Sequence, residues 1–326
     1  MKDNKDDYMK FSVLVLTYNP VLSNVLFTLD SIVNQKFDDF EIVVADDGSK
    51  DNLFPQIEEY FKEKNFSNYQ LVANKENGGT VKNLLSALKV ARGKYVRDFG
   101  AGDCFFDENS IRDVYEFLEK SDKEGCFGLM CGFYRDEKGM IKRKEFCHPF
   151  DINAYRKAKD NRILKNLVLY SDHASGAATC YRKEYYEEYL KKIENCVTYE
   201  EDIFQVIAAL EGRRLDFFDH YLVWYEVGDG VSTQKNSRFA QLLQQDVDRF
   251  YEMIFEKFPE HKLVKKRKQV AKFYKIRNLY LRTILRFFVN PDAIRYLFAS
   301  FLQRISGAHK EKVYREGFLD QKEFIR

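Results

Sequence analysis

Residues 40–49 read FEIVVADDGS, and this stretch decides the fold. It begins with an apolar run rich in β-branched side chains, which is typical of a strand buried on both faces. The run ends at Asp46 and Asp47, and the Gly48 and Ser49 that follow favour a turn. A buried strand that ends in two carboxylates predicts a parallel sheet with a polar site at one edge.

The neighbouring segments repeat this pattern. A similar apolar run, FSVLVL, occupies residues 11–16, and further strands are predicted at residues 69–73 and 94–99. Apolar residues at helical spacing predict helices between the strands, over residues 23–35, 53–61 and 80–92. The alternation predicts an α/β fold with a mostly parallel central sheet flanked by helices.

Polar residues follow the carboxyl ends of three predicted strands, where ligands bind in such sheets. They are Thr17, Tyr18, Asn19, Asp46, Asp47, Gly102 and Asp103. The first strand is followed neither by GxGxxG nor by GxxxxGK[ST], the usual phosphate-binding loops. A crevice lined by carboxylates that binds a polyphosphate needs a divalent cation between the carboxylates and the phosphates. Mn²⁺ or Mg²⁺ suits such oxygen ligands.

Four strings in order, VLVLTYNP, EIVVADDGS, NGGTVKN and RGKYVRDFGAGD, resemble the N-terminal half of family 2 glycosyltransferases, which have the GT-A fold. Further along, YEED at residues 199–202 resembles the family's ED motif, and GRRLDFFDHYLVWY resembles the following late strand. The resemblance covers roughly residues 10–232. It implies an enzyme that uses a nucleotide-sugar donor.

The resemblance also implies roles for single residues. Those expected around the nucleotide base and ribose are Thr17, Tyr18, Asn19, Asp46 and Asp47. Those expected near the diphosphate or the base are Asn77, Gly78 and Lys82, with Gly102 also counted in the donor site. Asp103 takes the metal-binding position. Asp202 is the expected general base, and Glu201 beside it is expected to shape the acceptor site.

Purely structural roles remain open for the same residues. Residues 46–49 are compatible with an ordinary turn, and Lys82 with a solvated helix position. Asp103 could cap the helix that follows it. Asp202 could be a favourable charge at a helix N-terminus, and neither of these last two roles excludes a role in the site.

Two departures from the family pattern affect the prediction. The metal motif of the family is usually DxD or DDD, whereas residues 100–103 read GAGD and hold one carboxylate. Cation binding would then depend on Asp103, the donor diphosphate and water, and it should be weak without nucleotide. The QxxRW motif of processive members is absent, which favours transfer of a single sugar.

We therefore expect an inverting glycosyltransferase that moves one sugar to a hydroxyl of a glycan or lipid-linked glycan, in surface polysaccharide or glycoconjugate assembly. UDP as the nucleotide is implied by the resemblance. Two alternatives stay open. A nucleotidyltransferase would need a glycine-rich loop after the first strand, where the sequence reads TYNPVLSN. A glycan-binding pseudoenzyme is compatible with the reduced metal motif.

Charge is distributed unevenly along the chain. The formal net charge is +2, but residues 262–326 carry 17 Lys and Arg against 5 Asp and Glu, which leaves −10 for the rest (2 − 12). We predict a catalytic domain over residues 8–235 and a basic helical region over residues 236–326, with helices at 239–258, 263–289 and 291–305.

The basic region has two main interpretations. It could be a helical subdomain that packs on the catalytic domain with a basic outer face, or it could dock on an anionic membrane leaflet. No nucleic-acid-binding module is recognisable, so nucleic acid is not an expected partner. No secretory signal or apolar spanning segment is recognisable either, so a cytoplasmic protein is expected, with peripheral attachment to the inner face of the plasma membrane as the alternative.

Overall fold

The computed structural model describes residues 9–135, 141–146, 148–227, 237–273, 276, 278–306 and 316–320. Its strands are β1 (Met9–Thr17), β2 (Phe40–Asp46), β3 (Tyr69–Ala73), β4 (Gly93–Gly100), β5 (Cys104–Phe105), β6 (Gly125–Arg135), β7 (Ile141–Phe146), β8 (Thr179–Arg182) and β9 (Asp216–Glu226). Within the described residues these strands form one sheet in the order β3-β2-β1-β4-β8-β6-β9-β5, with β7 paired to β6.

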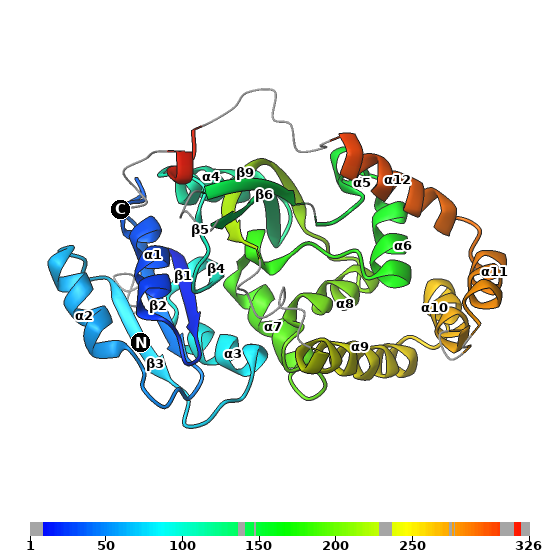
Figure 1. Ribbon diagram of the computed structural model, residues 1–326, viewed down its shortest axis with the longest axis horizontal. Coiled ribbons are helices and arrows are strands. Elements are labelled where there is room, and N and C mark those ends of the chain that lie inside the picture. Colours follow the sequence, from blue (N-terminus) through cyan, green and yellow to red (C-terminus); the bar gives the residue numbers. More distant parts are fainter. Residues whose placement is uncertain are drawn as a thin grey trace, which may run out of the picture.

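Helices lie on both faces of the sheet, and a helical arm follows them (Figure 1). The first set is α1 (Leu22–Val33), α2 (Phe54–Glu63), α3 (Thr80–Val90), α4 (Ser110–Lys120), α5 (Ile152–Arg156), α6 (Asp160–Tyr170), α7 (Lys183–Ile193) and α8 (Phe204–Leu210). The later helices are α9 (Ser237–Lys257), α10 (Lys262–Phe273), α11 (Leu279–Val289) and α12 (Ala293–Ser306). Short 3-10 turns are η2 (Gly176–Ala178), η3 (Glu201–Ile203) and η4 (Phe318–Asp320).

The strands β3, β2, β1 and β4 are parallel, as the sequence predicts. Their register places Thr17 opposite Asp46 and Leu16 opposite Gly100. Three strand ends therefore meet at one edge of the sheet. The later strands add antiparallel pairs, and β6 and β9 pair in parallel.

The sheet is buried on both faces because side chains alternate between two apolar clusters. In β2, Val43 and Ala45 pack with α3, α7 and α8, whereas Ile42 and Val44 pack with α1, α2 and α4. This explains the continuous apolar run of residues 40–45, since a strand covered on one face only would alternate apolar and polar side chains. The rigid strands hold the loops that follow them.

The start of the basic helical region shares the core of the catalytic body. Phe250 and Ile254 of α9 and Val264 of α10 are buried in the same cluster as the helices α3, α7 and α8. At the other end of the region, Phe318 of η4 is buried beside β5 and α4. Residues on both sides of the predicted boundary at 235 thus bury their side chains together.

The single helix predicted over residues 263–289 is wrong, because the structure has two helices there. α10 ends at Phe273, and α11 begins at Leu279. The side chain of Asn278 accepts a hydrogen bond from the Leu281 N–H at 3.0 Å, so it caps a new helix. None of the helices in the described part of the chain is both long enough and apolar enough to cross a bilayer.

Candidate active site

Asp46 holds the turn between β2 and α2. Its carboxylate accepts hydrogen bonds from the Ser49 N–H at 2.7 Å and the Ser49 hydroxyl at 2.6 Å. The Thr17 hydroxyl donates to the same carboxylate at 2.9 Å, and the Asn19 N–H donates to the Ser49 hydroxyl at 2.7 Å. Tyr18 lies between these residues with 52% of its surface exposed. The network leaves an open aromatic face at the strand ends, and such faces stack well on nucleotide bases.

Asp47 holds the loop before α3. It accepts hydrogen bonds from the Asn74 side-chain amide at 2.9 Å, the Gly78 N–H at 3.0 Å and the Gly79 N–H at 2.8 Å. A carboxylate has about four acceptor positions, so about one is left for a ligand. Asp47 therefore has a structural role whether or not it binds a ligand. Binding of the nucleotide by Asp47 is what the resemblance implies.

Asn77, Gly78 and Lys82 line a pocket of about 360 Å³, together with Asn74 and Ser86. A Cβ at Gly78 would lie 2.9 Å from Cδ of Lys82, so the absence of a side chain there lets the Lys82 stem lie against the loop. Among the described residues, no hydrogen bond or ion pair joins Lys82 to Asp103 or Asp202. This pocket lies on the Asp47 side of the site.

Asp103 lies beside a second carboxylate, that of Glu226 at the end of β9. The Glu226 N–H donates to Oδ1 of Asp103 at 2.8 Å. Gly102 has φ +113, and a Cβ there would lie 2.6 Å from Oε2 of Glu226, so both its conformation and its surroundings favour glycine. Burial is the main reason why the pKa of Asp103 is raised to about 7, and the charge of Glu226 contributes to the increase. The hydrogen bond from the Glu226 N–H and the charge of Arg97 oppose it.

Asp202 and Glu201 begin η3 on the other side of β4. Oδ2 of Asp202 accepts the Gly176 N–H at 2.5 Å. Oδ1 of Asp202 is buried and has no hydrogen-bond partner in the described part of the chain. Burial raises the pKa of Asp202 well above its usual range, and the charge of Glu200 adds to the shift. Burial and the neighbouring Asp202 likewise raise the pKa of Glu201.

Two residues with ionisable side chains inside β4, Arg97 and Asp98, lie close to these carboxylate groups. Burial raises the pKa of Asp98 to about 6, and the Tyr186 hydroxyl donates to this carboxyl at 3.2 Å. The guanidinium of Arg97 is fully buried, lies 3.7 Å from the ring centre of Phe99, and donates to the Ala177 carbonyl at 2.6 Å. Asp98 influences the pKa of both Glu201 and Asp202, whereas Arg97 influences that of Asp103.

A chain of contacts connects Asp47 with the segment that supplies Asp202. Asp47 holds Gly79, and Gly79 lies against Thr198, whose carbonyl accepts the Val81 N–H at 3.2 Å. Four residues later the same segment supplies Asp202. Asp47 thus follows the end of β2 and is linked through Gly79 and Thr198 to the segment of Asp202, whereas Asp103 follows the end of β4.

Sequence analysis missed Glu226, Asp98 and Arg97. Asp98 and Arg97 left a signal, because two charged residues inside an otherwise apolar strand, YVRDF, are unusual. Glu226 left a weaker signal, an acid at the end of the late strand. Its neighbour Asp103 is 123 residues away in the chain, so only the tertiary structure pairs them.

The oxygen ligands that Asp103 and Glu226 offer fit a divalent cation. They are carboxylate oxygens from two strand ends, and hard oxygen ligands suit Mg²⁺ and Mn²⁺. Within the described ranges, no group of three or more His, Cys, Asp or Glu side chains could hold a metal ion. Further ligands would therefore have to come from the donor diphosphate and water.

Comparison with solved structures defines the class of protein. S. aureus TarS 1–349 in complex with UDP has a TM-score of 0.51 and 20% sequence identity, covering 94% of this chain and 93% of that chain. GalNAc-T7 with UDP, GalNAc and Mn²⁺ has a TM-score of 0.56 and 13% identity, covering 91% of this chain and 58% of that one. These similarities show the GT-A glycosyltransferase fold and confirm the predicted fold class.

The sequence places the chain within that class. The model of glycosyl transferase family 2 matches residues 12–190, so the chain belongs to this family. Dolichyl-phosphate beta-glucosyltransferase of Dictyostelium discoideum is 30% identical over 188 residues, which are 54% of this chain and 51% of that protein. Poly(ribitol-phosphate) beta-N-acetylglucosaminyltransferase TarS of Staphylococcus aureus is 34% identical over 114 residues, 34% of this chain and 19% of that protein. The chain thus matches about half the length of the first relative and about a fifth of the second.

Proposed function

We propose that this chain is an inverting glycosyltransferase that moves a single sugar from a UDP-sugar to a hydroxyl of a glycan or lipid-linked glycan. The observation that carries the proposal is the state of Asp202. One oxygen of its carboxyl is held by the Gly176 N–H, and the other is buried without a hydrogen-bond partner among the described residues. An oriented carboxylate with one oxygen that forms no hydrogen bond to the protein suits a general base.

UDP as the donor nucleotide has support from the relative TarS and from a second protein of the same fold. TarS has been solved with UDP and with UDP-GlcNAc, and GalNAc-T7 with UDP. In this chain, the exposed ring of Tyr18 and the remaining acceptor position of Asp47 are the groups we assign to the base. Asn77, Gly78, Lys82 and Gly102 are assigned to the donor as well, with the Lys82 ammonium facing its phosphates.

Asp103 and Glu226 are the residues that would hold a divalent cation. When bound, such a cation offsets the negative charge that develops on the leaving UDP. The two residues are brought together by a backbone hydrogen bond, so the site is already oriented before a donor arrives.

The acceptor hydroxyl would lose its proton to Asp202 as the new glycosidic bond forms. The raised pKa of Asp202 makes its carboxylate a stronger base than that of a solvated aspartate. A base on the side opposite the leaving group allows one in-line displacement, which inverts the anomeric carbon. Glu201 would shape the acceptor site beside it, and His173, whose Nε2 lies 3.5 Å from Glu200, lies near the same carboxylates.

Thermal shift with a panel of nucleotide sugars in Mn²⁺ would identify the donor, because a ligand that binds the folded state stabilises it. With that donor, Asp202→Asn should lower turnover roughly 100-fold or more, in the range of general-base catalysis. The stabilisation by UDP should stay unchanged, because Asp202 is assigned to the acceptor and not to the donor.

A matched control is Glu194→Gln, an exposed acid that follows α7. It should keep wild-type turnover. Turnover of Asp202→Asn equal to that of the wild type would refute the assignment of the base. Thermal stabilisation by nucleoside triphosphates but not by nucleotide sugars would instead favour a nucleotidyltransferase.

A further inference from the structure

Large apolar side chains are exposed mainly on α11 and α12. In the part of the chain that the structure describes, nine of the twelve exposed large hydrophobic residues belong to these two helices. They are Tyr280, Leu281, Ile284, Phe288, Ile294, Leu297, Phe298, Phe301 and Leu302. So many exposed apolar side chains on two neighbouring helices indicate an interaction site.

The exposed residues follow the helical repeat. On α11, Tyr280, Ile284 and Phe288 recur every four residues and are 82%, 64% and 87% exposed. On α12, the opposite face packs on the body of the protein, where Tyr296 stacks on Tyr170 of α6 at 4.1 Å between ring centres. Each helix is therefore amphipathic, with its apolar stripe turned away from the protein.

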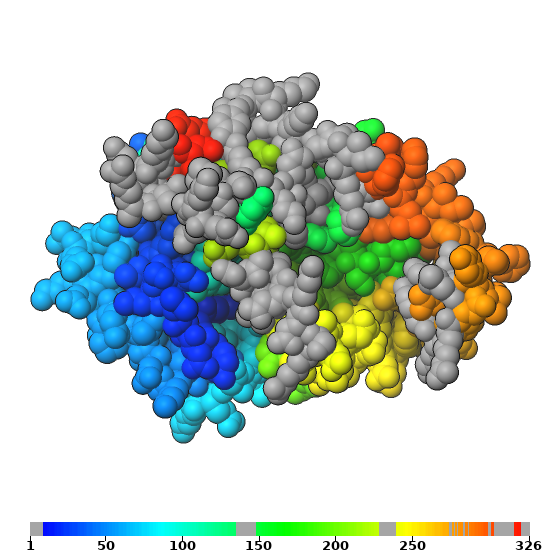
Figure 2. Space-filling view, viewed as in Figure 1, coloured from blue at the N-terminus to red at the C-terminus, as the bar shows by residue number. Residues whose placement is uncertain are grey.

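Positive charge accompanies the apolar stripes. The helices α10, α11 and α12 contain ten Lys and Arg residues and no Asp or Glu (Lys262, Lys265, Lys266, Arg267, Lys268, Lys272, Arg282, Arg286, Arg295 and Arg304). In Figure 2 the orange surface of α11 and α12 forms one end of the molecule. Basic helices with an exposed apolar face are typical of proteins that bind in the interfacial region of a membrane.

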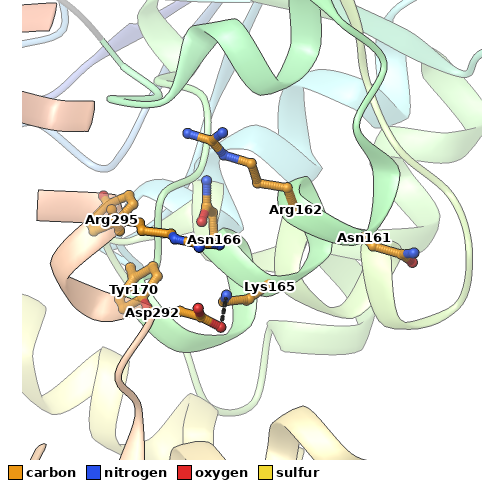
Figure 3. Close-up of a pocket in the computed structure, with 8 residues that line it drawn as sticks. Asn161, Arg162, Lys165, Asn166, Tyr170, Asp292 and Arg295 are labelled. Atoms are coloured by element: carbon orange, nitrogen blue, oxygen red, sulfur yellow. Dashed lines mark hydrogen bonds and ion pairs between the residues drawn. The ribbon is translucent and has the colours of Figure 1, made fainter. Parts of the chain in front are cut away.

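A pocket of about 330 Å³ lies between α6 and α12 at the edge of this surface (Figure 3). Three cations line it, Arg162, Lys165 and Arg295, together with one carboxylate, that of Asp292. Lys165 pairs with Asp292 at 2.5 Å, and Arg162 pairs with the buried Asp151 at 2.5 Å. Arg295 is exposed and adds the excess positive charge that a phosphate group would meet.

We propose that α11 and α12 dock on an anionic phospholipid leaflet. The apolar stripes enter the interface, and the pocket lined by Arg162, Lys165 and Arg295 takes the phosphate of a lipid headgroup. Insertion and cation–headgroup attraction act together, and both are needed because a single weak signal gives only reversible binding. A second copy of the chain fits this surface less well, since a symmetric dimer would bring two helix sets with ten cations each against one another.

The docking surface is connected to the proposed acceptor site. α12 packs on α6 through the Tyr170–Tyr296 stack, and the Tyr296 hydroxyl donates to Asp172, just beyond the end of α6. The same segment continues to Gly176, whose N–H holds Asp202. Docking would thus set the acceptor side of the site against the leaflet. This orientation rests on the proposed function, and it fits a lipid-linked acceptor.

Co-sedimentation of the full chain with vesicles tests the docking without any need for activity. We expect binding to vesicles of phosphatidylcholine with phosphatidylglycerol, and at least tenfold weaker binding to phosphatidylcholine alone. Phe298→Ser combined with Phe301→Ser should lower the partition coefficient at least tenfold, because two rings are lost from the interface. Arg295→Gln should lower it about fivefold on the anionic vesicles only.

Matched controls come from exposed residues elsewhere on the protein. Val21→Ser, at a residue 62% exposed, and Lys89→Gln, at an exposed position of α3, should bind as the wild type does. Circular dichroism melts establish that all variants fold. Asp202→Asn should also bind like the wild type, which separates this inference from the proposed function.

Two results would overturn the inference. One is equal vesicle binding by the wild type and by the Phe298 and Phe301 double variant. The other is a wild-type dimer in analytical ultracentrifugation without lipid that the double variant converts to a monomer, since the stripes would then cover a second copy of the chain.

Discussion

Glu226 stands next to Asp103 because β9 ends beside the loop that follows β4. The change Glu226→Gln keeps the shape of the side chain and removes its charge. We expect the Mn²⁺ concentration for half-maximal activity to rise roughly tenfold or more, as for the loss of a carboxylate from or beside a metal site. Turnover at saturating Mn²⁺ should stay close to that of the wild type.

A Mn²⁺ titration of activity after treatment with EDTA measures this effect. Glu116→Gln is the matched control, because Glu116 is an exposed acid on α4. An unchanged Mn²⁺ dependence in Glu226→Gln would remove Glu226 from the proposed cation site and leave Asp103 as its one protein carboxylate.

The raised pKa of Asp98 predicts how the free energy of unfolding depends on pH. Burial raises its pKa from 3.8 to about 6 in the folded state, so the folded protein holds this proton more tightly than the unfolded chain does. The stability that the neutral carboxyl provides is present below pH 3.8 and is lost as the pH rises through about 6. Asp98→Asn cannot ionise and can still accept the Tyr186 hydrogen bond.

Urea unfolding at several pH values measures this difference. The free energy of unfolding of Asp98→Asn should equal that of the wild type well below pH 3.8 and exceed it by about 1–3 kcal/mol well above pH 6, where the difference becomes constant. A difference that does not change with pH would show that burial does not shift the pKa of Asp98.

At the scale of elements, the loop before α3 is clamped between Asp47 and the segment that leads to η3. Gly79 has φ +86, and a Cβ there would lie 2.3 Å from Cγ2 of Thr198 and 2.8 Å from its carbonyl oxygen. Gly79→Ala should therefore combine backbone strain with a steric clash. We expect it to lower the free energy of unfolding by roughly 2–4 kcal/mol.

Gly212→Ala separates the two causes. Gly212 has a similar φ of +82, but a Cβ there would meet no atom within 4 Å. It should cost only about 1–2 kcal/mol, the price of the left-handed conformation. Equal losses in urea unfolding would mean that the contact with Thr198 adds nothing.

At the scale of the whole molecule, residues 316–320 return to the catalytic body after the helical arm (Figure 1). The Phe318 N–H donates to the Phe106 carbonyl at 2.7 Å, and the Trp224 indole donates to the same carbonyl at 3.1 Å. The ring of Phe318 is only 5% exposed. The far end of the chain is therefore part of the core next to β5.

Phe318→Ala should lower the free energy of unfolding by roughly 2–4 kcal/mol, because it leaves a cavity in that core. Phe288→Ala is the matched control, since Phe288 is 87% exposed on α11, and it should change stability by no more than about 0.5 kcal/mol in the absence of membrane. Equal urea denaturation curves for the two variants would mean that η4 does not contribute to stability.

The amino-acid sequence by itself determined the parallel first half of the sheet and proposed most of the residues of the candidate site. The apolar runs at residues 11–16 and 40–45, each followed by polar residues, were enough to predict parallel strands with a site at their ends, because that signal is local and periodic. The resemblance to the family's motifs implied the roles of Asp103 and Asp202.

Only the tertiary structure decided which distant residues meet. It paired Asp103 with Glu226, placed Asp98 near Glu201 and Asp202, and returned Phe318 to the core. It also turned the apolar stripes of α11 and α12 away from the body, where helical periodicity alone was compatible with packing onto it. The physical reason is that periodicity shows which residues share a face of a helix or strand, whereas what that face contacts depends on chain segments far away in the sequence.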